Sequence, residues 1–493
     1  MTESLTNHRL YPLANPRSLA FFGASNNFSS MGTMIMTALM HFGYAGELYP
    51  VHPKETTVQG YTAYARAEDI PAVPDLAVVV LPTAIVCETI EACGKKGIRN
   101  AIIVSGGFKE TGEEGARREK ELVAIAEKYG ISIIGPNCLG VTNTHHHLNT
   151  TPHRYYGRPG FIGLASQSGS FVTQMFAYLN SLELGFSTAF SIGNEANTDI
   201  VDCLEYLGAC PHTRVIALYV EAIHRGRQFV ETARRITPRK PIVAVYVGGS
   251  ETGRRAALSH TGAMSGPDDL YDGIFRQAGV IRAASITEMF DICAALGQLP
   301  APAGNGVMVQ THSGGPGAVA ADACGRAGLS LPQPGQATRE KIADLVPATG
   351  SIKNPIDITF TKDITQFFTS LPQALMTDPE CHLLLLYFYL PEDMMKGALL
   401  RMGVSHEKLD DKVFEVARML CQSVRRLIND SGKPVVCFSY QTPQETATRI
   451  LAEEGIPFFQ GPERAVRVIR AMLEYRRADN KINRQNPSPP RRL

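Results

Sequence analysis

Short apolar runs with the length of β-strands recur along this chain, and stretches with the periodicity of amphipathic helices separate them. Glycine-rich turns lie between the two kinds of segment. This alternation is typical of parallel α/β layers, and it occurs three times in succession. The sequence therefore predicts an α/β protein built from three parallel-sheet domains.

The first unit covers about residues 10–140 and has a Rossmann-like order of elements. A polar loop at 141–160 leads to a second unit, which closes near residue 298. The expected strands of the first unit are 18–23, 46–51, 76–82, 100–107 and 131–137. Those of the second unit are 161–169, 186–193, 213–221 and 240–249.

The third unit follows a linker at 299–306, with expected strands at 307–317, 381–390 and 433–440. The last fifteen residues are polar, basic and contain proline, so we expect them to be disordered. The predicted organisation is a domain at 1–145, a second at 155–298, a third at 305–475 and a disordered tail at 479–493.

Composition narrows the class of protein. The formal net charge of +1 lacks the basic excess that nucleic-acid binding needs, so we expect no nucleic-acid partner. The ten cysteines form no CxxC pair, and the chain opens on a polar segment without a signal-peptide core. No apolar run is long enough to cross a membrane. We expect a cytoplasmic protein without a membrane partner.

The turn after the first strand, GASNNFSSMG, does not fit the dinucleotide fingerprint. Ser25 and Phe28 occupy the places of its second and third glycines. His52, Pro53 and Lys54 stand where an NAD enzyme needs an acidic residue after its second strand. The cation at Lys54 suits a phosphorylated ribose or a pyrophosphate, so a phosphate-bearing nucleotide other than NAD is favoured. A Rossmann dehydrogenase is disfavoured for the same reasons.

Further candidate ligand residues follow the fourth and fifth expected strands. Ligands bind at the carboxyl ends of the strands in such sheets, although each glycine there can equally serve only a tight turn. The residues are Ser105, Gly106 and Gly107 in SGGFKETG, and the segment GPNC that ends the fifth strand.

A helix N-terminus suited to binding a phosphoryl group is expected in the second unit, where SQSGS joins an apolar strand to an amphipathic helix. Free amide groups at a helix N-terminus attract phosphoryl groups, but the serines can also be plain N-caps. The residues are Ser166, Gln167, Ser168, Gly169 and Ser170, and Asn194 in SIGNEANTD is a further candidate ligand contact.

His260, in the loop SHTGAMSG, is a candidate nucleophile among 13 histidines. An imidazole attacks phosphorus best when a carboxylate holds its other nitrogen, and Glu221 at the end of an apolar strand can serve in that way. A structural histidine is the alternative. The adjacent His145, His146 and His147 are interpreted as loop residues, and no metal site is predicted.

The ordered motifs FFGAS, YPVHPK, GPNCLG, SQSGS, GNEAN, SHTGAMSG, HSGGPGAVAADAC and NPIDI resemble those of the NDP-forming acyl-CoA synthetases. The resemblance covers the chain to about residue 475, is closest to ADP-forming acetate-CoA ligase alpha subunits, and extends distantly to succinyl-CoA synthetase alpha subunits. It implies a Rossmann-like CoA-binding domain and two flavodoxin-like ligase domains.

The resemblance also implies roles for the candidate residues. It implies that His260 is the phosphorylated histidine, that Glu221 steadies it, and that the SQSGS helix start holds the phosphoryl group. Residues that would meet CoA are Gly23, Ala24, Ser25 and Lys54 for the nucleotide, Ser105, Gly106 and Gly107 for the diphosphate or pantetheine arm, and Asn137 and Cys138 near the thiol.

The implied reaction interconverts acyl-CoA, ADP and phosphate with a carboxylic acid, CoA and ATP, through acyl phosphate and phosphohistidine. No ATP-grasp domain is recognisable in the sequence, so we expect a beta subunit to hold ATP or ADP with Mg²⁺, in a heterotetramer or around a homodimeric core. Tyr246 stands where many relatives carry a lysine. The alternative is a non-catalytic CoA or acyl-CoA binding protein, although such a protein has no need of a phosphoryl acceptor.

Overall fold

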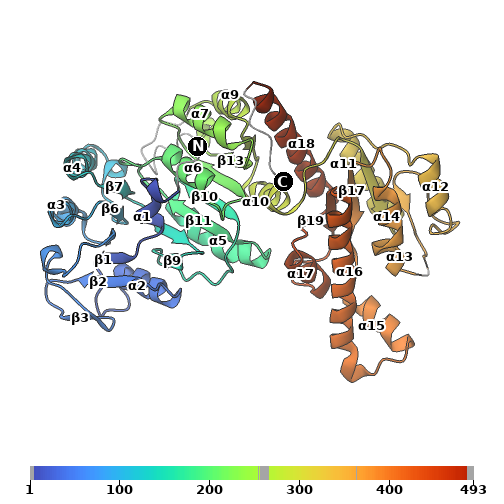
Figure 1. Ribbon diagram of the computed structural model, residues 1–493, viewed down its shortest axis with the longest axis horizontal. Helices are drawn as coiled ribbons and strands as arrows, with labels where there is room; N and C mark the ends of the chain where they lie inside the picture. The colour runs from blue at the N-terminus through green and yellow to red at the C-terminus, as the bar shows by residue number, and fades with distance from the viewer. Residues whose placement is uncertain (1–4, 254, 256–265, 362, 486–493) are drawn as a thin grey trace. The chain divides into compact units, whose positions relative to one another are not determined.

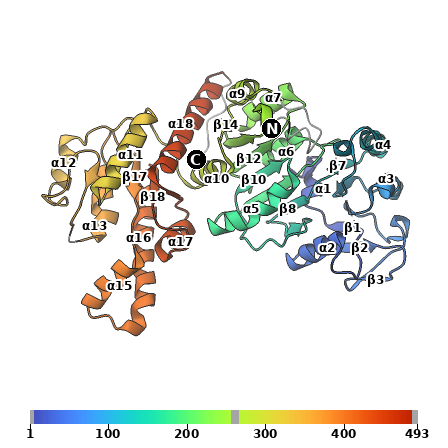
Figure 2. The ribbon, with the colours of Figure 1, turned by 180° about the vertical axis from the view of Figure 1, so that it is seen from behind.

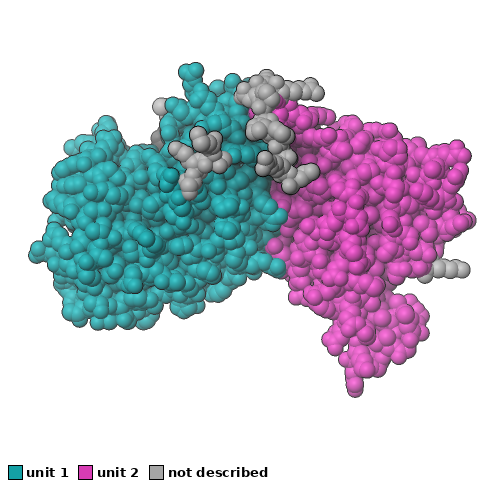
Figure 3. Space-filling view, in the orientation of Figure 1, with its two compact units in different colours: residues 1–180, 184–283 teal, residues 181–183, 284–493 magenta. Residues whose placement is uncertain are grey.

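The computed structural model describes residues 5–253, 255, 266–361 and 363–485. Contacts divide the chain into two compact units, one of residues 1–180 and 184–283 and one of 181–183 and 284–493 (Figure 3). Parallel sheets with helices between their strands make up both units (Figures 1 and 2). The predicted α/β class is confirmed. Within the described residues, no helix is both long and apolar enough to cross a bilayer.

The first sheet of unit 1 is entirely parallel, in the order β2-β1-β5-β6-β7. Each strand coincides with the apolar centre of an expected run. The strands are β1 (Ser18–Phe22), β2 (Glu47–Val51), β5 (Leu76–Val79), β6 (Asn100–Ile103) and β7 (Ser132–Ile134). The helices between them are α2 (Met31–His41), α3 (Val86–Lys96) and α4 (Glu113–Tyr129).

The second sheet of unit 1 has the order β14-β13-β12-β10-β11-β8-β9. Its parallel strands are β10 (Ile162–Ser166), β11 (Phe186–Ser191), β12 (Val215–Val220), β13 (Ile242–Tyr246) and β14 (Ile281–Arg282). Its helices are α5 (Gly169–Ser181), α6 (Ile200–Ala209), α7 (Gly226–Ile236) and α9 (Asp268–Ala278). All residues of β10 and β11 and all but one of β12 are buried, as expected for a sheet covered on both faces.

The segment expected to be a loop at 141–160 begins instead with an antiparallel hairpin. Strands β8 (Gly140–Asn143) and β9 (Leu148–Asn149) pair with each other, and β8 also pairs with β11. Buried threonine and asparagine side chains satisfy one another there, since Thr142 donates a hydrogen bond to Asn149 at 3.1 Å. Residues just before the predicted boundary at 145 therefore belong to the second sheet.

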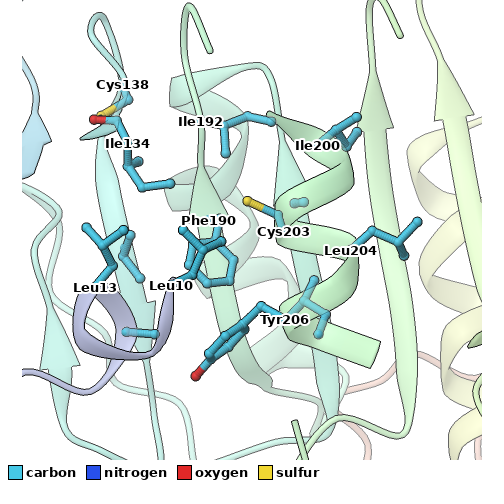
Figure 4. Close-up of a cluster of buried hydrophobic side chains, with 14 of the residues drawn as sticks. Leu10, Leu13, Ile134, Cys138, Phe190, Ile192, Ile200, Cys203, Leu204 and Tyr206 are labelled. Carbon is cyan, nitrogen blue, oxygen red and sulfur yellow. The ribbon is translucent and has the colours of Figure 1, made fainter. Parts of the chain in front are cut away.

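One hydrophobic core joins the two sheets of unit 1 (Figure 4). It gathers side chains from the N-terminal helix α1 (Tyr11–Ala14), from β7, from β11 and from α6. The labelled members are Leu10, Leu13, Ile134, Cys138, Phe190, Ile192, Ile200, Cys203, Leu204 and Tyr206. The first two expected domains thus form a single compact unit, because they share the apolar surface that each would otherwise bury alone.

Unit 2 holds a third parallel sheet in the order β16-β15-β17-β18-β19. The strands are β15 (Val307–Thr311), β16 (Ile356–Asp357), β17 (Leu383–Tyr387), β18 (Val435–Ser439) and β19 (Phe458–Gln460). Its helices are α10 (Ile286–Gln298), α11 (Gly314–Arg326), α12 (Gln336–Ile342), α13 (Thr365–Phe368), α14 (Ser370–Met376), α15 (Glu392–Arg401), α16 (Leu409–Ser431), α17 (Thr446–Glu453) and α18 (Pro462–Gln485).

Two expectations for this region differ from the structure. Helix α10 lies before the expected boundary at 298 but belongs to unit 2, where Asp291 pairs with Arg464 of α18 at 2.8 Å. Residues 479–485, expected to be disordered, continue α18, because Ile482 is buried and no proline interrupts the helix before residue 487.

Candidate functional site

The turn after β1 is packed too tightly for any residue but glycine at two positions. Gly23 has φ +98°, and a Cβ atom on it would lie 2.0 Å from the carbonyl oxygen of Val80. A Cβ atom on Gly32, at the start of α2, would lie 2.1 Å from the carbonyl oxygen of Gly23. Gly32 thus lets the helix approach the turn closely, which is the role of the third glycine in a dinucleotide fingerprint. In this chain that glycine stands four residues after the place the fingerprint gives it. Ala24, which follows Gly23 in this turn, is buried.

Ser25 and Lys54 border the same end of the first sheet. The Ser25 amide donates to the hydroxyl of Thr33 at 3.0 Å, and its carbonyl accepts from the side chain of Gln59 at 3.0 Å. Lys54 is exposed, and its amide donates to Nδ1 of His52 at 3.3 Å. The turn is therefore braced by side chains from α2 and from the segment after β2, with the lysine left at the surface.

A pocket of about 450 Å³ brings predicted residues of both sheets of unit 1 together. Seven of them line it: Ser105, Gly106, Asn137, Cys138, Gln167, Gly169 and Ser170. Its apolar wall consists of Met31, Val80, Leu81, Val104 and Leu139. The loops expected to meet CoA and the helix start expected to meet a phosphoryl group thus face one cavity.

Ser105 ties two strands of the first sheet together. Its hydroxyl donates to the carbonyl of Leu81 at 2.6 Å and accepts from the amide of Leu81 at 3.1 Å. Gly107 has φ +95°, and its amide donates to the Glu110 carboxylate at 2.5 Å. These contacts fix the shape of the loop, which presents Gly106 to the pocket.

Asn137 and Cys138 follow β7. Asn137 has a left-handed backbone with φ +57°, which asparagine tolerates better than most residues. The Cys138 thiol is buried and donates to the carbonyl of Ile103 at 3.3 Å, and burial raises its pKa to about 12. This thiol is therefore a core group and not a reactive nucleophile.

The start of α5 faces the pocket, and the turn that leads into it is fixed by hydrogen bonds. The buried Ser166 hydroxyl donates to the carbonyl of Ser168 at 2.8 Å and accepts from its amide at 3.2 Å, which sets the turn into the helix. Gly169 and Ser170 form the first helical positions and line the pocket. The positive end of the α5 dipole therefore meets the cavity.

Gln167 connects this helix start to the end of β12. Its Oε1 accepts from the amides of Glu221 at 2.5 Å and Ala222 at 3.0 Å. Its Nε2 donates to the carbonyl of Ala222 at 2.7 Å and to the Glu195 carboxyl at 2.8 Å. The side chain expected to contact a phosphoryl group is thus engaged in holding the protein backbone.

Glu221 is 6% exposed at the carboxyl end of β12, directly after the strand. Its expected partner, His260, lies outside the described residues, so their pairing stays a prediction.

Tyr246, at the end of β13, stacks on Tyr271 with ring centroids 3.6 Å apart and donates its hydroxyl to the carbonyl of Gly266 at 2.7 Å. Tyr246 thus holds the backbone of Gly266, the last residue of the SHTGAMSG loop that contains His260.

Asn194 is buried and its amide is used within the protein. It donates to Glu110 at 2.7 Å and to Glu119 at 2.8 Å, and Lys109 lies 3.4 Å from Glu119. Asn137 donates to the side-chain oxygen of Asn194 at 3.3 Å. This network, which sequence reasoning missed, joins the loop after β6 to the loop after β11. The charged pair in SGGFKE was its only sequence signal.

The three adjacent histidines lie in the turn between β8 and β9, and each contacts the backbone carbonyl of a different residue. His145 contacts Gly160 at 2.9 Å, His146 contacts Pro16 at 2.7 Å, and His147 contacts Phe42 at 3.1 Å. Across the described ranges, no cluster of histidine, cysteine and carboxylate side chains could hold a metal ion. Their contacts are those of a structural turn.

Comparison with known proteins adds the family. Residues 17–144 match the CoA binding domain model, and residues 159–296 match the succinyl-CoA ligase like flavodoxin domain model. The alpha subunit of acetate-CoA ligase (ADP-forming) II of Pyrococcus furiosus is 36% identical over 461 residues, which cover 93% of this chain and 96% of that one. The chain belongs to the ADP-forming acetate-CoA ligase family.

Other members of the family agree with this assignment. Acetate-CoA ligase (ADP-forming) I of Archaeoglobus fulgidus is 36% identical over 460 residues, and the match covers 93% of this chain but 63% of that one. A solved structure from Candidatus Korarchaeum cryptofilum, the dinucleotide-forming acetyl-coenzyme A synthetase 1 in complex with phosphate and ADP, superposes with a TM-score of 0.86. It is 30% identical in sequence, and the match covers 97% of this chain and 99% of that chain.

Proposed function

We propose that this chain is the alpha subunit of an NDP-forming acyl-CoA synthetase, an acid-thiol ligase that interconverts acyl-CoA, ADP and phosphate with a carboxylic acid, CoA and ATP. The observation that carries the proposal is the pocket shared by the two sheets of unit 1. Loops suited to CoA and a helix start suited to a phosphoryl group line the same cavity, and a thioester and a phosphate must meet in such a place to react.

In the direction of thioester cleavage, a phosphate oxygen attacks the acyl carbon, the carbon–sulfur bond breaks, and CoA leaves as a thiol with one proton. A ring nitrogen of His260 then attacks the phosphorus of the acyl phosphate, and the carboxylate leaves. Phosphohistidine finally transfers the phosphoryl group to a terminal oxygen of ADP, which breaks the phosphorus–nitrogen bond and yields ATP. The reverse sequence activates an acid.

The protein's contribution to these steps is positioning and electrostatic support. The amides at the start of α5 would stabilise phosphoryl oxygens near Gly169 and Ser170, which line the pocket. Glu221 would accept a hydrogen bond from the N–H of the second ring nitrogen of His260 and so raise the basicity of the attacking nitrogen. Its burial at the end of β12 supports this role, because a buried carboxylate requires a hydrogen-donating partner.

CoA would bind along the carboxyl ends of the first sheet. The turn at Gly23, Ala24 and Ser25, with Lys54 beside it, would take the nucleotide phosphates. The loop of Ser105, Gly106 and Gly107 would take the diphosphate or the pantetheine arm. Asn137 and Cys138 would lie near the thiol of CoA, since both line the shared pocket.

ATP or ADP with Mg²⁺ would be held by a partner beta subunit with an ATP-grasp domain, in a cytoplasmic heterotetramer or around a homodimeric core. The subunit name of the Pyrococcus furiosus relative supports a partner. The Archaeoglobus fulgidus relative supports it as well, because about a third of that longer chain lies outside the match. The acid substrate would be a small carboxylic acid.

The proposal is tested by phosphoryl labelling. The chain is incubated with [γ-³²P]ATP, Mg²⁺ and a beta subunit, and we expect acid-labile, base-stable label on the wild type. His260→Ala should take no label, whereas His406→Ala, which changes an exposed histidine of unit 2, should label normally. An unlabelled wild type, or equal labelling of His260→Ala, would remove the phosphohistidine mechanism.

The CoA site is tested separately by titration calorimetry. Lys54→Glu should weaken CoA binding about tenfold, because it replaces an attractive charge near phosphates by a repulsive one. Lys120→Glu makes the same change at an exposed position of α4 and should leave affinity unchanged. Equal affinities of both variants would contradict the placement of the nucleotide.

A further inference from the structure

Glu195 is a buried carboxyl group in the loop between β11 and α6. Its side chain is 3% exposed, and its backbone has a left-handed conformation with φ +55°. Glutamate has no side-chain geometry that favours this conformation, so the surrounding contacts must hold it there. A buried side chain on an unfavourable backbone conformation is typical of functional sites, where the surrounding structure holds a group in a defined position.

Two hydrogen bonds fix the carboxyl. Its Oε1 accepts from the amide of Ile200 at the start of α6 at 2.8 Å, and its Oε2 accepts from Nε2 of Gln167 at 2.8 Å. Gln167 in turn accepts with its other end from the amides of Glu221 and Ala222. A continuous chain of hydrogen bonds therefore runs from α6 through Glu195 and Gln167 to the backbone of Glu221.

The charged and titratable groups around Glu195 come from several elements. His224, after β12, places Nε2 3.6 Å from the carboxyl. Four further groups interact with it electrostatically: Lys109 from the loop after β6, Asp199 before α6, Cys203 of α6 and Tyr271 of α9. Asp199 is itself paired with Arg225. Desolvation dominates over these neighbours and raises the pKa of Glu195 to about 8, whereas burial lowers the pKa of His224. At neutral pH the carboxyl therefore holds a proton.

We propose that Glu195 is a positioning residue for phosphoryl transfer: it orients Gln167, and Gln167 sets the distance between the start of α5 and Glu221. The inference rests on the proposed function, because it gives Glu221 and the α5 start the roles described above. Glu195 does not line the pocket, so it affects the reacting groups through its hydrogen bond to Gln167 and through its charge.

Two consequences separate positioning from a merely structural role. Removing the carboxyl should slow labelling of His260 while CoA affinity stays unchanged, because Glu195 braces the phosphoryl side of the pocket only. Ionisation of Glu195 above pH 8 should also slow the reaction, because it places a buried negative charge beside the segment that carries Glu221. A neutral replacement should abolish this alkaline decline.

The test measures the rate of ³²P transfer to His260 in the full chain with its beta subunit, together with CoA affinity. Glu195→Ala should lower the rate about a hundredfold, Gln167→Ala by a similar factor, and the double variant no further. Glu231→Gln, a change at an exposed carboxyl of α7, should match the wild type. Additive losses in the double variant, or a wild-type rate in Glu195→Ala, would overturn the inference.

Glu195→Gln provides the second measurement should Glu195→Ala fail to fold. This variant keeps the shape of the neutral carboxyl but loses one hydrogen bond, so its rate should fall about tenfold at pH 7. The wild-type rate should decline above pH 8, and that of Glu195→Gln should not. An alkaline decline that persists in Glu195→Gln contradicts the inference alone, whereas an unlabelled wild type contradicts the proposed function.

Discussion

Gly32 tests how the turn after β1, the turn proposed to bind the CoA nucleotide, is built. In Gly32→Ala, the new Cβ atom would lie 2.1 Å from the oxygen of Gly23, 2.5 Å from its carbonyl carbon and 3.0 Å from the nitrogen of Ala24. All three are backbone atoms, so no side chain can rotate away. The turn cannot retreat either, because the α-carbon of Gly23 is packed against the carbonyl of Val80.

The expected cost follows from these distances. Relieving the clash requires a shift of α2 from the turn by about 1 Å, and such overpacking typically costs about 1 to 3 kcal/mol. The better helix propensity of alanine offsets less than about 1 kcal/mol of this cost. Because the shift moves the turn that would hold the CoA nucleotide, we also expect CoA affinity to fall about tenfold, which corresponds to about 1.4 kcal/mol.

Gly273→Ala is the matched control. Gly273 lies inside α9 of the same unit, and nothing stands within 4 Å of its added Cβ atom, so alanine should stabilise by about 0.5 to 1 kcal/mol. Urea unfolding followed by far-UV circular dichroism gives the stabilities, since the chain has no tryptophan, and calorimetry gives CoA affinity. The steric reasoning is refuted if Gly32→Ala is as stable as Gly273→Ala and binds CoA like the wild type.

Three further predictions concern buried groups. Arg464→Ala removes the ion-pair partner of the buried Asp291 and should lower the stability of unit 2 by about 3 kcal/mol, measured by thermal unfolding. An unchanged stability would show that the ion pair does not stabilise the unit. At pH 8 a chromogenic disulfide should titrate at most one of the ten thiols of the native protein, because only Cys87 is partly exposed and its pKa is raised to about 11; rapid reaction of several thiols would contradict the described burial. Burial lowers the pKa of Lys240 to about 8, so its folded form loses its proton before the unfolded form does. Between pH 8 and 10 the free energy of unfolding of the wild type should therefore rise by about 1 to 2 kcal/mol relative to that of Lys240→Met. If the two variants show the same dependence of unfolding free energy on pH, the prediction is wrong.

The sequence predicted the strands well where apolar residues fill them. The five residues of β10, for example, are all buried and lie within the expected run. The β8–β9 hairpin was missed because its buried residues include Thr142, Thr144 and Asn149, whose composition is that of a loop. Their burial depends on hydrogen bonds across the hairpin, and these are not visible in the pattern of apolar and polar positions.

The loops that line the pocket could be located from the sequence, because they follow the carboxyl ends of parallel strands, and the ligands assigned to them stay predictions. The duties of individual side chains were not predictable. Gln167 meets Glu195 across 28 positions of the sequence, and Asn194 meets Glu110 across 84. Such partners are brought together only by the packing of the two sheets, so a local motif identifies the loop without assigning its bonds.

The core shared by the two sheets of unit 1 has a consequence for motion. Side chains from β7, β11 and α6 fill one apolar interior, so the loops after β6 and β7 cannot separate from the start of α5 without exposing it to water. A hinge motion between the two walls of the pocket would therefore expose apolar surface, which is unfavourable in water. The two walls are therefore expected to keep their spacing, so that a ligand meets a largely preformed cavity of about 450 Å³.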